Sequence, residues 1–554
     1  MDADLFLQQF GHLAQGEGGI KKLRDVILQL AVQGKLIAQS QADEPAQTRL
    51  KKINPKATKI DGLYEIPSNW VWTKLEAVST YIQRGKGPTY SDVKQVPVVS
   101  QKCVQWRGFD FVLARFIDPE TLQNYQAERF LVAGDLLWNS TGTGTLGRVC
   151  IYPGSDLYSK VVADSHVTIV RLNSMEPRYV WCFLASPIVQ MNIEASGSTN
   201  QIELSTSTVK NHPVPIPPFA EQKRIVAKVD ELMALCDKLE AEQKAQCTLK
   251  TQAVQSTLNH LTSAESPTSF DSSLNILEGT FGDWFDDLAT VKHLRATILQ
   301  LAVQGKLVPQ NSTDEPASEL LKRVEAEKKR LVKEGKIKKS SVITDSIPSS
   351  SEPFNLPYGW AWSLLSNITL SISDGDHQAP PQADRGIPFL VISNVRNGTV
   401  DTQKASRFVP ESYYEGLDRQ RKPEKGDILY TVTGSIGIPV IVNTEDKFCF
   451  QRHIAIIKPL DNSDRRYLHL YLKSDLALEQ ATKSATGIAQ LTIPLKSLRG
   501  LLVPLPPLAE QKRIVAKVDE LMVLCDQLEA CITHTQTLNT HLMDSLIHRM
   551  TEAA

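Results

Sequence analysis

The sequence has few of the features that mark secreted, membrane or metal-binding proteins. None of its eight cysteines forms a C-x-x-C pair, and no Cys/His cluster has zinc-ligand spacing. No apolar run approaches the roughly 18 residues that a membrane span needs. The first residues, MDADLFLQQFGHL, carry acidic side chains where a signal peptide carries basic ones. These absences predict a cytoplasmic protein whose cysteines are mostly buried thiols.

Motifs of catalysis are also missing. GTGTLGRV (142–149) imitates a P-loop, but Arg148 and Val149 stand where Lys and Ser/Thr are required, so a turn between strands is expected. The sequence contains neither the asparagine-proline-proline-aromatic motif of adenine methyltransferases nor a convincing glycine-rich cofactor loop. The tripeptide Glu445-Asp446-Lys447 lacks the upstream acidic partner of a nuclease site, which favours a hairpin turn. We therefore expect this chain to be no enzyme and to bind no metal or cofactor.

Charge of one sign is not in excess either. The net charge is −1 and the pI about 6.8. This balance argues against a general nucleic-acid coat, although it permits local basic surfaces. The 554 residues exceed what one hydrophobic core organises, so two or more domains are expected.

The strongest positive signal is an internal repeat. Residues 219–241, FAEQKRIVAKVDELMALCDKLEA, return at 508–530 with 20 identities in 23 positions, and residues 23–46 return at 294–317 with 17 in 24. Each half therefore has a short helix, a variable region of about 150 residues, a proline-rich stretch and a long helix. Near-identical helices around divergent regions indicate one scaffold that presents two different recognition surfaces.

The variable regions have the alternation of short strands. Strands are expected at 96–100, 166–172, 387–392 and 453–459. GDLLWNSTGTGTLGRV (134–149) resembles GDILYTVTGSIG (426–437). The second half also carries a basic insert, 318–339, with nine Lys/Arg and four Glu, which is expected to be a helix. Linkers are expected at 262–273 and 346–353.

Both long helices carry apolar residues at heptad spacing, a pattern that favours two helices paired as a coiled coil over a helix lying on its own domain. A pseudo-two-fold relation between the halves would make the pair antiparallel. A helix of ~40 residues rises about 60 Å, so it could serve as a spacer. The seam, expected to pair the helices and to support partner binding, comprises Ile225, Val229, Leu232, Leu239, Ile514, Val518, Leu521 and Leu528.

AEQKRIV after a proline-rich stretch, LQLAVQGKL before each variable region and the paired GD-[IL]-L motifs together resemble the Type I restriction-modification specificity subunits, over essentially the whole chain. The resemblance implies a non-catalytic protein that reads a bipartite, asymmetric DNA target. It also implies partners: two adenine-methyltransferase (modification) subunits and restriction/translocase subunits, which would hold S-adenosylmethionine, ATP and Mg²⁺. The basic insert is a departure from the minimal family plan and leaves partner docking in that half open.

The expected fold class is α+β, with two β-rich α/β target-recognition domains joined by two long antiparallel helices in a pseudo-two-fold repeat. The expected segments are an N-terminal helical segment at 1–65, recognition domain 1 at 66–218, a central long helix at 219–262, a linker with the repeated helical segment and basic insert at 263–355, recognition domain 2 at 356–506 and a C-terminal long helix at 507–554.

Polar residues in turns and at strand ends are the candidate DNA contacts, because such positions reach base edges and phosphates. In the first domain they are Arg84, Lys86, Gln101, Lys102, Ser140, Thr141, Arg148 and Gln201; in the second they are Asp374, His377, Asn394, Arg396, Thr433, Arg452 and Gln490. His166 and His453, at strand starts, are expected to be structural or to face DNA.

Two other functions compete with this one. A coiled-coil scaffold whose β-rich domains bind peptides or proteins would suit the near-neutral charge. A stand-alone restriction enzyme would need a cofactor loop or nuclease motif. Binding to random duplex DNA at low salt, with a steep salt dependence, separates the DNA reader from the scaffold.

Overall fold

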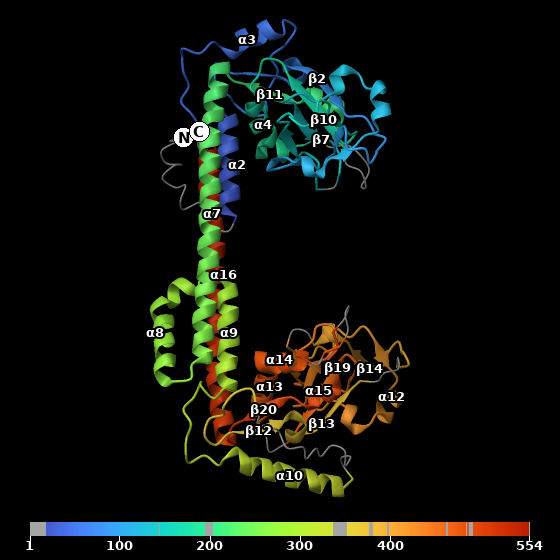
Figure 1. Cartoon of the computed structure of the whole chain (residues 1–554), viewed down its shortest axis with the longest axis vertical. Coiled ribbons are helices and arrows are strands. Elements are labelled where there is room, and N and C mark those ends of the chain that lie inside the picture. Colours follow the sequence, from blue (N-terminus) through green and yellow to red (C-terminus); the bar gives the residue numbers. More distant parts are fainter. Residues whose placement is uncertain are drawn as a thin grey trace. The chain divides into compact units, whose positions relative to one another are not determined.

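Each half of the repeat folds into nearly the same elements in the same order (Figure 1). The structure is a computed structural model. It describes residues 18–142, 144–193, 203–335, 352–375, 380–395, 398–460, 464–483, 485–486 and 491–552. Contacts divide the chain into two units, residues 1–247 with 535–554 and residues 248–534.

The first unit contains a four-stranded antiparallel sheet that is buried on both faces. Its side chains alternate as a pleated strand requires: Leu136 and Trp138 join one core, and Leu137 joins the core on the other face. The strand order is β2 (Ser79–Arg84), β10 (Val167–Leu172), β7 (Leu136–Asn139) and β8 (Val149–Ile151).

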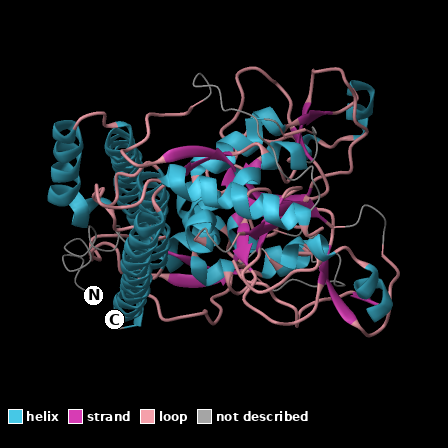
Figure 2. Cartoon of the chain, turned by 90° about the horizontal axis from the view of Figure 1, so that it is seen from below, coloured by secondary structure: helices cyan, strands magenta, loops and turns pink. Residues whose placement is uncertain are grey.

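The first unit also contains three smaller sheets. The strands of the chain are short and joined by long loops (Figure 2). The three-stranded sheet has the order β6 (Arg115–Phe116), β3 (Pro97–Val99) and β9 (Val162–Ala163). The two pairs are β1 (Val71–Lys74) with β11 (Pro213–Ile216), and β4 (Val104–Gln105) with β5 (Gly108–Phe109).

The second unit repeats this topology. Its four-stranded sheet has the order β13 (Thr369–Asp374), β19 (Ile454–Pro459), β16 (Ile428–Thr431) and β17 (Pro439–Ile441). The smaller sheets are β15 (Phe408–Val409), β14 (Ile387–Leu390) and β18 (Cys449–Phe450), and β12 (Ala361–Leu364) with β20 (Leu502–Leu505). Within the described residues of this unit, no strand pair corresponds to β4 and β5. The four strands expected from the sequence are confirmed as β3, β10, β14 and β19.

Short helices follow the last strand of each large sheet. They are α4 (Pro177–Ala185), α5 (Pro187–Gln190) and α6 (Thr206–Asn211), and α13 (Arg465–Lys473), α14 (Asp475–Lys483) and α15 (Leu495–Arg499). The remaining short helices are α11 (Leu365–Ile368), α12 (Glu411–Gly416), η1 (Leu75–Val78), η2 (Phe111–Leu113), η3 (Pro119–Asn124), η4 (Ala127–Arg129), η7 (Ile392–Asn394) and η8 (Arg419–Arg421).

The long helices are α7 (Phe219–Ser263) and α16 (Leu508–Glu552). Five of the eight seam residues are buried, and Leu239, Leu521 and Leu528 are partly buried. In the first unit, Val229 of α7 shares a core with Met543 near the end of α16 and with Ile27 of α2 (Gly19–Val32). In the second unit, Val518 of α16 shares a core with Leu258 near the end of α7 and with residues of α9 (Leu288–Val303). The sequence prediction of two paired helices thus left out a third helix in each unit.

Two sequence predictions about connections are wrong. The segment 262–273, expected to be a linker, is largely helical. Helix α7 ends at Ser263 and α8 (Pro267–Trp284) begins at Pro267. The Ser266 hydroxyl caps α8 by accepting from the backbone N–H of Ser269. The tripeptide 445–447 is no hairpin turn, since it joins β17 to β18, which lie in different sheets.

The described part of the basic insert lies mostly in α10 (Ala317–Lys333), the longer counterpart of α3 (Ala46–Ile53). Leu320 and Val324 bury one face of α10 in the second unit's core. On its outer face, cations pair with carboxylates of the same helix one turn away, as in Lys322–Glu319 and Lys329–Glu325. Much of the insert's positive charge is therefore balanced locally.

The GD motifs build a buried ion pair in each large sheet. Gly134 and Gly426 have φ of 92° and 95°, a turn that glycine adopts without strain. Asp135 then accepts two hydrogen bonds of 2.8 Å from Arg171 on β10, and Asp427 accepts one of 2.5 Å from Lys458 on β19. The shared motif is explained by folding rather than by recognition.

Six cysteines are buried, as expected, whereas Cys247 and Cys531 are exposed. Among the described helices, none is both long and apolar enough to cross a membrane.

Candidate nucleic-acid interface

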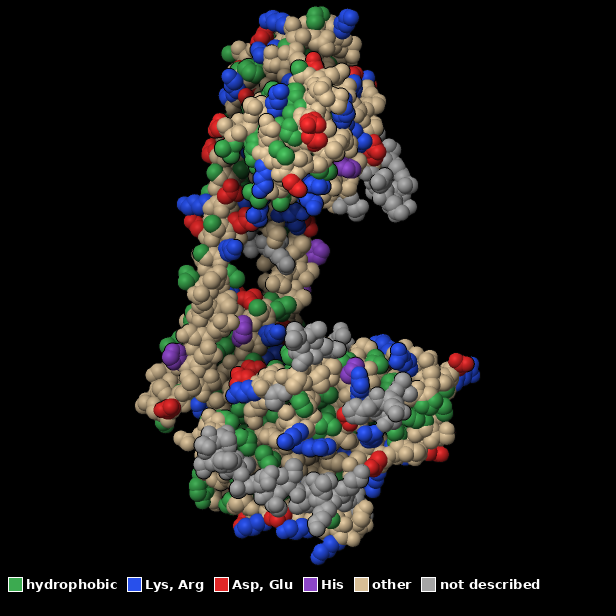
Figure 3. Space-filling view, turned by 45° about the vertical axis from the view of Figure 1, so that its right-hand side comes forward, with side chains coloured by type: hydrophobic (Ala, Val, Ile, Leu, Met, Phe, Trp, Pro, Cys, Tyr) green, Lys and Arg blue, Asp and Glu red, His purple; other side chains and the backbone are tan. Residues whose placement is uncertain are grey.

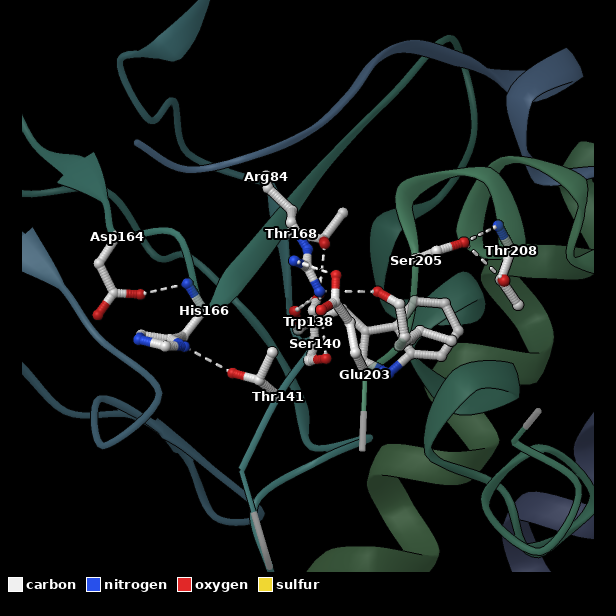
Figure 4. A network of polar contacts seen from close by, with 11 residues as sticks. Arg84, Trp138, Ser140, Thr141, Asp164, His166, Thr168, Glu203, Ser205 and Thr208 are labelled. Atoms are coloured by element: carbon white, nitrogen blue, oxygen red, sulfur yellow. Dashed lines mark hydrogen bonds and ion pairs between the residues drawn. The ribbon is translucent and has the colours of Figure 1, made fainter. Parts of the chain in front are cut away.

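Three strand ends of the first unit meet at one edge of its large sheet. The register places Arg84, at the end of β2, opposite Thr168 on β10, and Asn139, at the end of β7, opposite Val167. The chain after β2 passes close to the neighbouring backbone, since a Cβ on Gly85 would lie 2.1 Å from the Asp164 carbonyl oxygen. This position therefore requires glycine. Polar side chains from separate parts of the sequence gather there (Figure 4).

Arg84 is the cation of this edge, and it is already engaged. Its guanidinium forms an ion pair of 2.5 Å with Glu203 and donates to the carbonyl oxygens of Leu204 (3.1 Å) and Ser140 (3.4 Å). Its Nε is buried with no hydrogen-bond partner in the described part of the chain. Arg84 thus ties the residues before α6 to the sheet, and Glu203 neutralises it (Figure 4).

The neighbouring hydroxyl groups divide into buried and accessible ones. Ser140 is buried and its hydroxyl contacts that of Thr168. Thr141, by contrast, is partly exposed, and its hydroxyl lies 2.6 Å from Nδ1 of His166. The backbone N–H of His166 donates to Asp164 (2.9 Å), whose pKa is raised by burial. The Thr141–His166 pair can therefore exchange donor and acceptor roles at the surface, whereas Ser140 serves the interior.

The turn between β7 and β8 borders the same edge, which confirms that the P-loop imitation is a turn between strands. Gly142, Gly144 and Gly147 have positive φ. Arg148 fixes the turn by donating to the Gly144 carbonyl (2.8 Å) and to the Gln105 side chain (3.1 Å).

The other expected contacts of the first domain lie nearby and differ in how strongly other residues hold their side chains. Gln101 accepts from the Thr145 hydroxyl (3.1 Å) and holds Asn139 through its carbonyl (3.0 Å). Lys102 has an exposed side chain. Lys86 donates to the Asn124 carbonyl (3.3 Å), and its ammonium lies 5.3 Å from the centre of the Tyr125 ring.

In the second domain, three of the four expected contacts that the structure describes lie mainly in the interior. Asn394 is buried and donates to the carbonyl oxygens of Asp401 and Lys404 while accepting from the Val391 N–H. Thr433 is buried, and its backbone forms an isolated antiparallel β-bridge with Thr492. Thr141 forms the corresponding β-bridge with Glu203 in the first domain. Asp374 is nearly buried and lies 3.9 Å from Arg421.

Arg452 is an exposed cation just before β19, at the edge of the second domain's large sheet. Burial, and then the nearby Arg452, lower the pKa of His453. His453 therefore stays neutral more readily beside this cation. The remaining predicted contacts, Gln201, His377, Arg396 and Gln490, lie outside the described residues.

Sequence reasoning missed two groups at these edges. Glu203, the partner of Arg84, could not be found because pairing across 119 residues leaves no local pattern. Trp106 and Arg107 form the tip of the β4–β5 pair and are exposed. No sequence pattern marked them, because the exposure of Trp106 and Arg107 at the tip of a hairpin is visible only in the structure.

The repeated AEQKR sequence attaches each recognition domain to its long helix. Glu221 accepts from Gln39 (2.7 Å) and Trp70 (3.0 Å), and burial raises its pKa. Gln222 donates to the Pro217 carbonyl and accepts from the Glu176 N–H. In the second unit, Glu510 accepts from Gln310, and Gln511 contacts Pro506 and Asp464 in the same way.

Charged pairs strengthen both attachments. Arg178 of α4 pairs with Asp230 of α7, and Arg466 of α13 pairs with Asp519 of α16. The third helices are tied on too, by Arg24 to Asp237 (2.6 Å) and by Arg295 to Asp526 (2.5 Å). Many of the residues that are identical between 219–241 and 508–530 thus make contacts within the chain itself.

Charged side chains are scattered rather than segregated on the face drawn in Figure 3, where Lys and Arg lie among acidic and uncharged residues. No group of three or more His, Cys, Asp or Glu side chains suited to a metal ion occurs within the described ranges. The described residues at these edges offer hydrogen-bond donors and acceptors.

The two halves, each with its attachment sequence, match one family. Residues 67–249 and 382–536 match the family described as Type I restriction modification DNA specificity domain. The chain belongs to this family. Among members of the Type I specificity family, it is 30% identical over 563 residues to the Type I restriction enzyme EcoEI specificity subunit of Escherichia coli, covering 95% of this chain and 93% of the relative. It is 29% identical to the EcoAI specificity subunit of the same species, with the same coverage.

The solved structure of an HsdS subunit from Thermoanaerobacter tengcongensis is also similar. It is 20% identical to this chain, aligns with 88% of it and 98% of the other chain, and has a TM-score of 0.43.

Proposed function

We propose that this chain reads a bipartite, asymmetric DNA target, with one half-site for each recognition domain, and performs no chemistry itself. The single observation that carries the proposal is the pair of strand-end edges on a common scaffold. The sheets and their attachments repeat, whereas the polar groups at the edges differ, as Arg84 and Asp374 do at equivalent ends of β2 and β13. Different groups on one frame suit two different half-sites.

The long helices support the second part of the proposal, which is a platform for two modification subunits. In each unit the first part of one long helix shares a core with the last part of the other, an arrangement that an antiparallel pair with pseudo-two-fold symmetry produces. Some repeated side chains that neither the attachments nor the seam uses are exposed, among them Leu235 (39% exposed) and its equivalent Leu524 (52%). Two copies of one partner could bind these equivalent surfaces.

Methyl transfer and DNA cleavage would then belong to partners that hold S-adenosylmethionine, ATP and Mg²⁺. Restriction/translocase subunits would join the same assembly. The purified chain alone is expected to transfer no methyl group and to cut no DNA. Reproducible methylation without any partner subunit would contradict this assignment.

The decisive experiment replaces 67–212 with the corresponding region of a homologue and maps methylated adenines after expression with the modification subunits. One half of the methylated sequence should change, while the other half and the spacer persist, because recognition energy resides within a domain. A change in both half-sites at once would refute the modular reading.

Replacing the second variable region is the matched control, and should change only the opposite half. A peptide- or protein-binding scaffold predicts a different result from the start: no steeply salt-dependent affinity for random duplex DNA at low salt.

A further inference from the structure

The β4–β5 hairpin of the first domain presents an aromatic and a cation at its tip. Val104 pairs with Phe109 and Gln105 with Gly108, which leaves Trp106 and Arg107 as a two-residue tip. Trp106 is 49% exposed, and Arg107 is exposed with no hydrogen bond or ion pair to any described residue. Both side chains are therefore available to a ligand.

The base of this hairpin is firmly held. Cys103 and Val104 are buried in the core on one face of the large sheet, and Phe109 packs edge-on against Phe111 and Tyr152. The Asp110 N–H closes the base by donating to the Cys103 carbonyl (3.0 Å). Because the base of the hairpin is already fixed, the Trp106 indole loses little conformational entropy when it binds a ligand.

The hairpin also belongs to the edge already described. Arg148 joins it to the glycine turn, because its guanidinium bonds to both Gln105 and the Gly144 carbonyl. A cleft of about 440 Å³ lies between the tip residues and Arg148. Arg107 and Arg148 thus bring two guanidinium groups to one side of the glycine turn.

The second domain closes a span of equal length with the same backbone hydrogen bond. Its Asp401 N–H donates to the Asn394 carbonyl (3.0 Å), as Asp110 does to Cys103, and the spans 103–110 and 394–401 have equal length. Within these spans CVQWRGFD stands against NVRNGTVD, so Trp106 and Arg107 correspond to Asn397 and Gly398. A shared closing hydrogen bond around different residues is what a specificity element requires.

We propose that the Trp106-Arg107 tip enters a groove of the first half-site and that Arg107 reads a base edge there. A two-stranded ribbon fits the major groove, and an arginine can donate two parallel hydrogen bonds to the O6 and N7 of guanine. The Trp106 indole packs against the sugar or base edge beside it and excludes water from the contact. This inference rests on the proposed function and names one element of its first recognition surface.

The test uses the full-length chain and a 40-bp duplex library with a randomised centre, selected at low salt and sequenced. The wild type should select a two-part motif. Arg107→Ala and Arg107→Lys should both lose preference at one base of one half-site by roughly 5- to 150-fold, because Lys keeps the charge but not the paired donors. Trp106→Ala should weaken binding to the selected site and leave the other half-site's preferences unchanged. Val112→Ala, at a 90% exposed apolar position of the same domain, is the control and should select the wild-type motif.

Two outcomes would overturn the inference while leaving the proposed function standing. One is an unchanged motif and affinity in both the Arg107 and Trp106 variants. The other is a uniform loss of affinity in Arg107→Ala that Arg107→Lys restores, which is the behaviour of a phosphate contact. A wild type that selects no motif at all would overturn both. Thermal unfolding of each variant shows that it is folded.

Discussion

The attachment of each recognition domain and the edge of its sheet behave in opposite ways when the two halves are compared. At the attachment, Glu221, Gln222 and Arg178 have equivalents that make equivalent contacts. At the edge, an ion-paired Arg84 corresponds to a nearly buried Asp374. The two repeats keep the same residues where each domain packs on its long helix, and they differ where the strands of the large sheet end. Sequence identity between the repeats therefore marks contacts that hold the fold together rather than contacts for recognition.

One position on the short helices lies between these extremes. Trp181 of α4 donates to the Val149 carbonyl (3.0 Å), and its counterpart His469 of α13 donates to the Pro439 carbonyl (3.2 Å). Arg178 lies over the indole, 4.1 Å from its centre. In the second unit, a cavity of about 540 Å³ borders His469, Arg466 and Lys473. The backbone contact is kept while the packing around it changes.

Breaking the helix beneath one attachment should have the largest effect. Val229→Pro or Val518→Pro removes a helix hydrogen bond and costs about 3 kcal/mol or more. We expect lost co-purification with the modification subunits, while hydrogen exchange shows that the sheet of each recognition domain stays folded. Val229→Ala keeps the hydrogen bond and should retain assembly. Complexes of unchanged stoichiometry with the proline variants would count against the helices as a platform.

Removing the cation of a buried ion pair should come next. Arg171→Ala or Lys458→Ala leaves Asp135 or Asp427 charged and buried, at a cost of about 3–5 kcal/mol in the free energy of unfolding. Arg171→Lys restores the charge but not the hydrogen bonds to the Glu128 and Phe130 carbonyls, so an intermediate loss is expected. Denaturant unfolding measures both. Equal stability of Arg171→Ala and Arg171→Lys would show that the positive charge at position 171 does not contribute to the free energy of unfolding.

Acid should weaken both units over the same pH range. Burial lowers the pKa of His212 and of His469 to about 4, against 6.5 for an exposed histidine. Between these values the unfolded chain binds more protons, so stability is full above pH 6.5 and falls as the pH drops toward 4. Each histidine contributes a loss of about 3 kcal/mol. His212→Gln should flatten this slope for the first unit in hydrogen exchange at pH 7, 5.5 and 4.5. The same slope in variant and wild type would contradict the assignment.

The smallest expected effect is an exchange between the halves. His469→Trp should keep the hydrogen bond to Pro439, place an indole near Arg466 and stabilise the second unit by about 0.5–1 kcal/mol at neutral pH. It should also remove the part of that unit's acid sensitivity that His469 contributes. A destabilised variant would show that the space around His469 is too narrow for an indole.

Much of the fold could be predicted because the repeat and the strand alternation are local patterns. HVTIVRL (166–172) forms β10, as its alternation predicted. The third helices α2 and α9 were missed as partners of the long helices, because a heptad seam records which face is buried but not how many neighbours bury it.

The sites were harder to predict than the fold. Polar residues at strand ends such as Ser140 and Asn394 are buried and bonded inside the domain, which only three-dimensional contacts reveal. Lys102 and Arg452 lie exposed at the edges, where the sequence analysis expected contacts to DNA.

The order of synthesis has a consequence for how the first unit matures. That unit comprises residues 1–247 and 535–554, so Met543, Leu546 and Ile547 join its core long after α7 has left the ribosome. Until then, the apolar side of α7 near Ile225 and Val229 lacks these neighbours. A nascent chain therefore carries a temporarily uncovered surface in its earlier half, and early termination would damage the half that was made first.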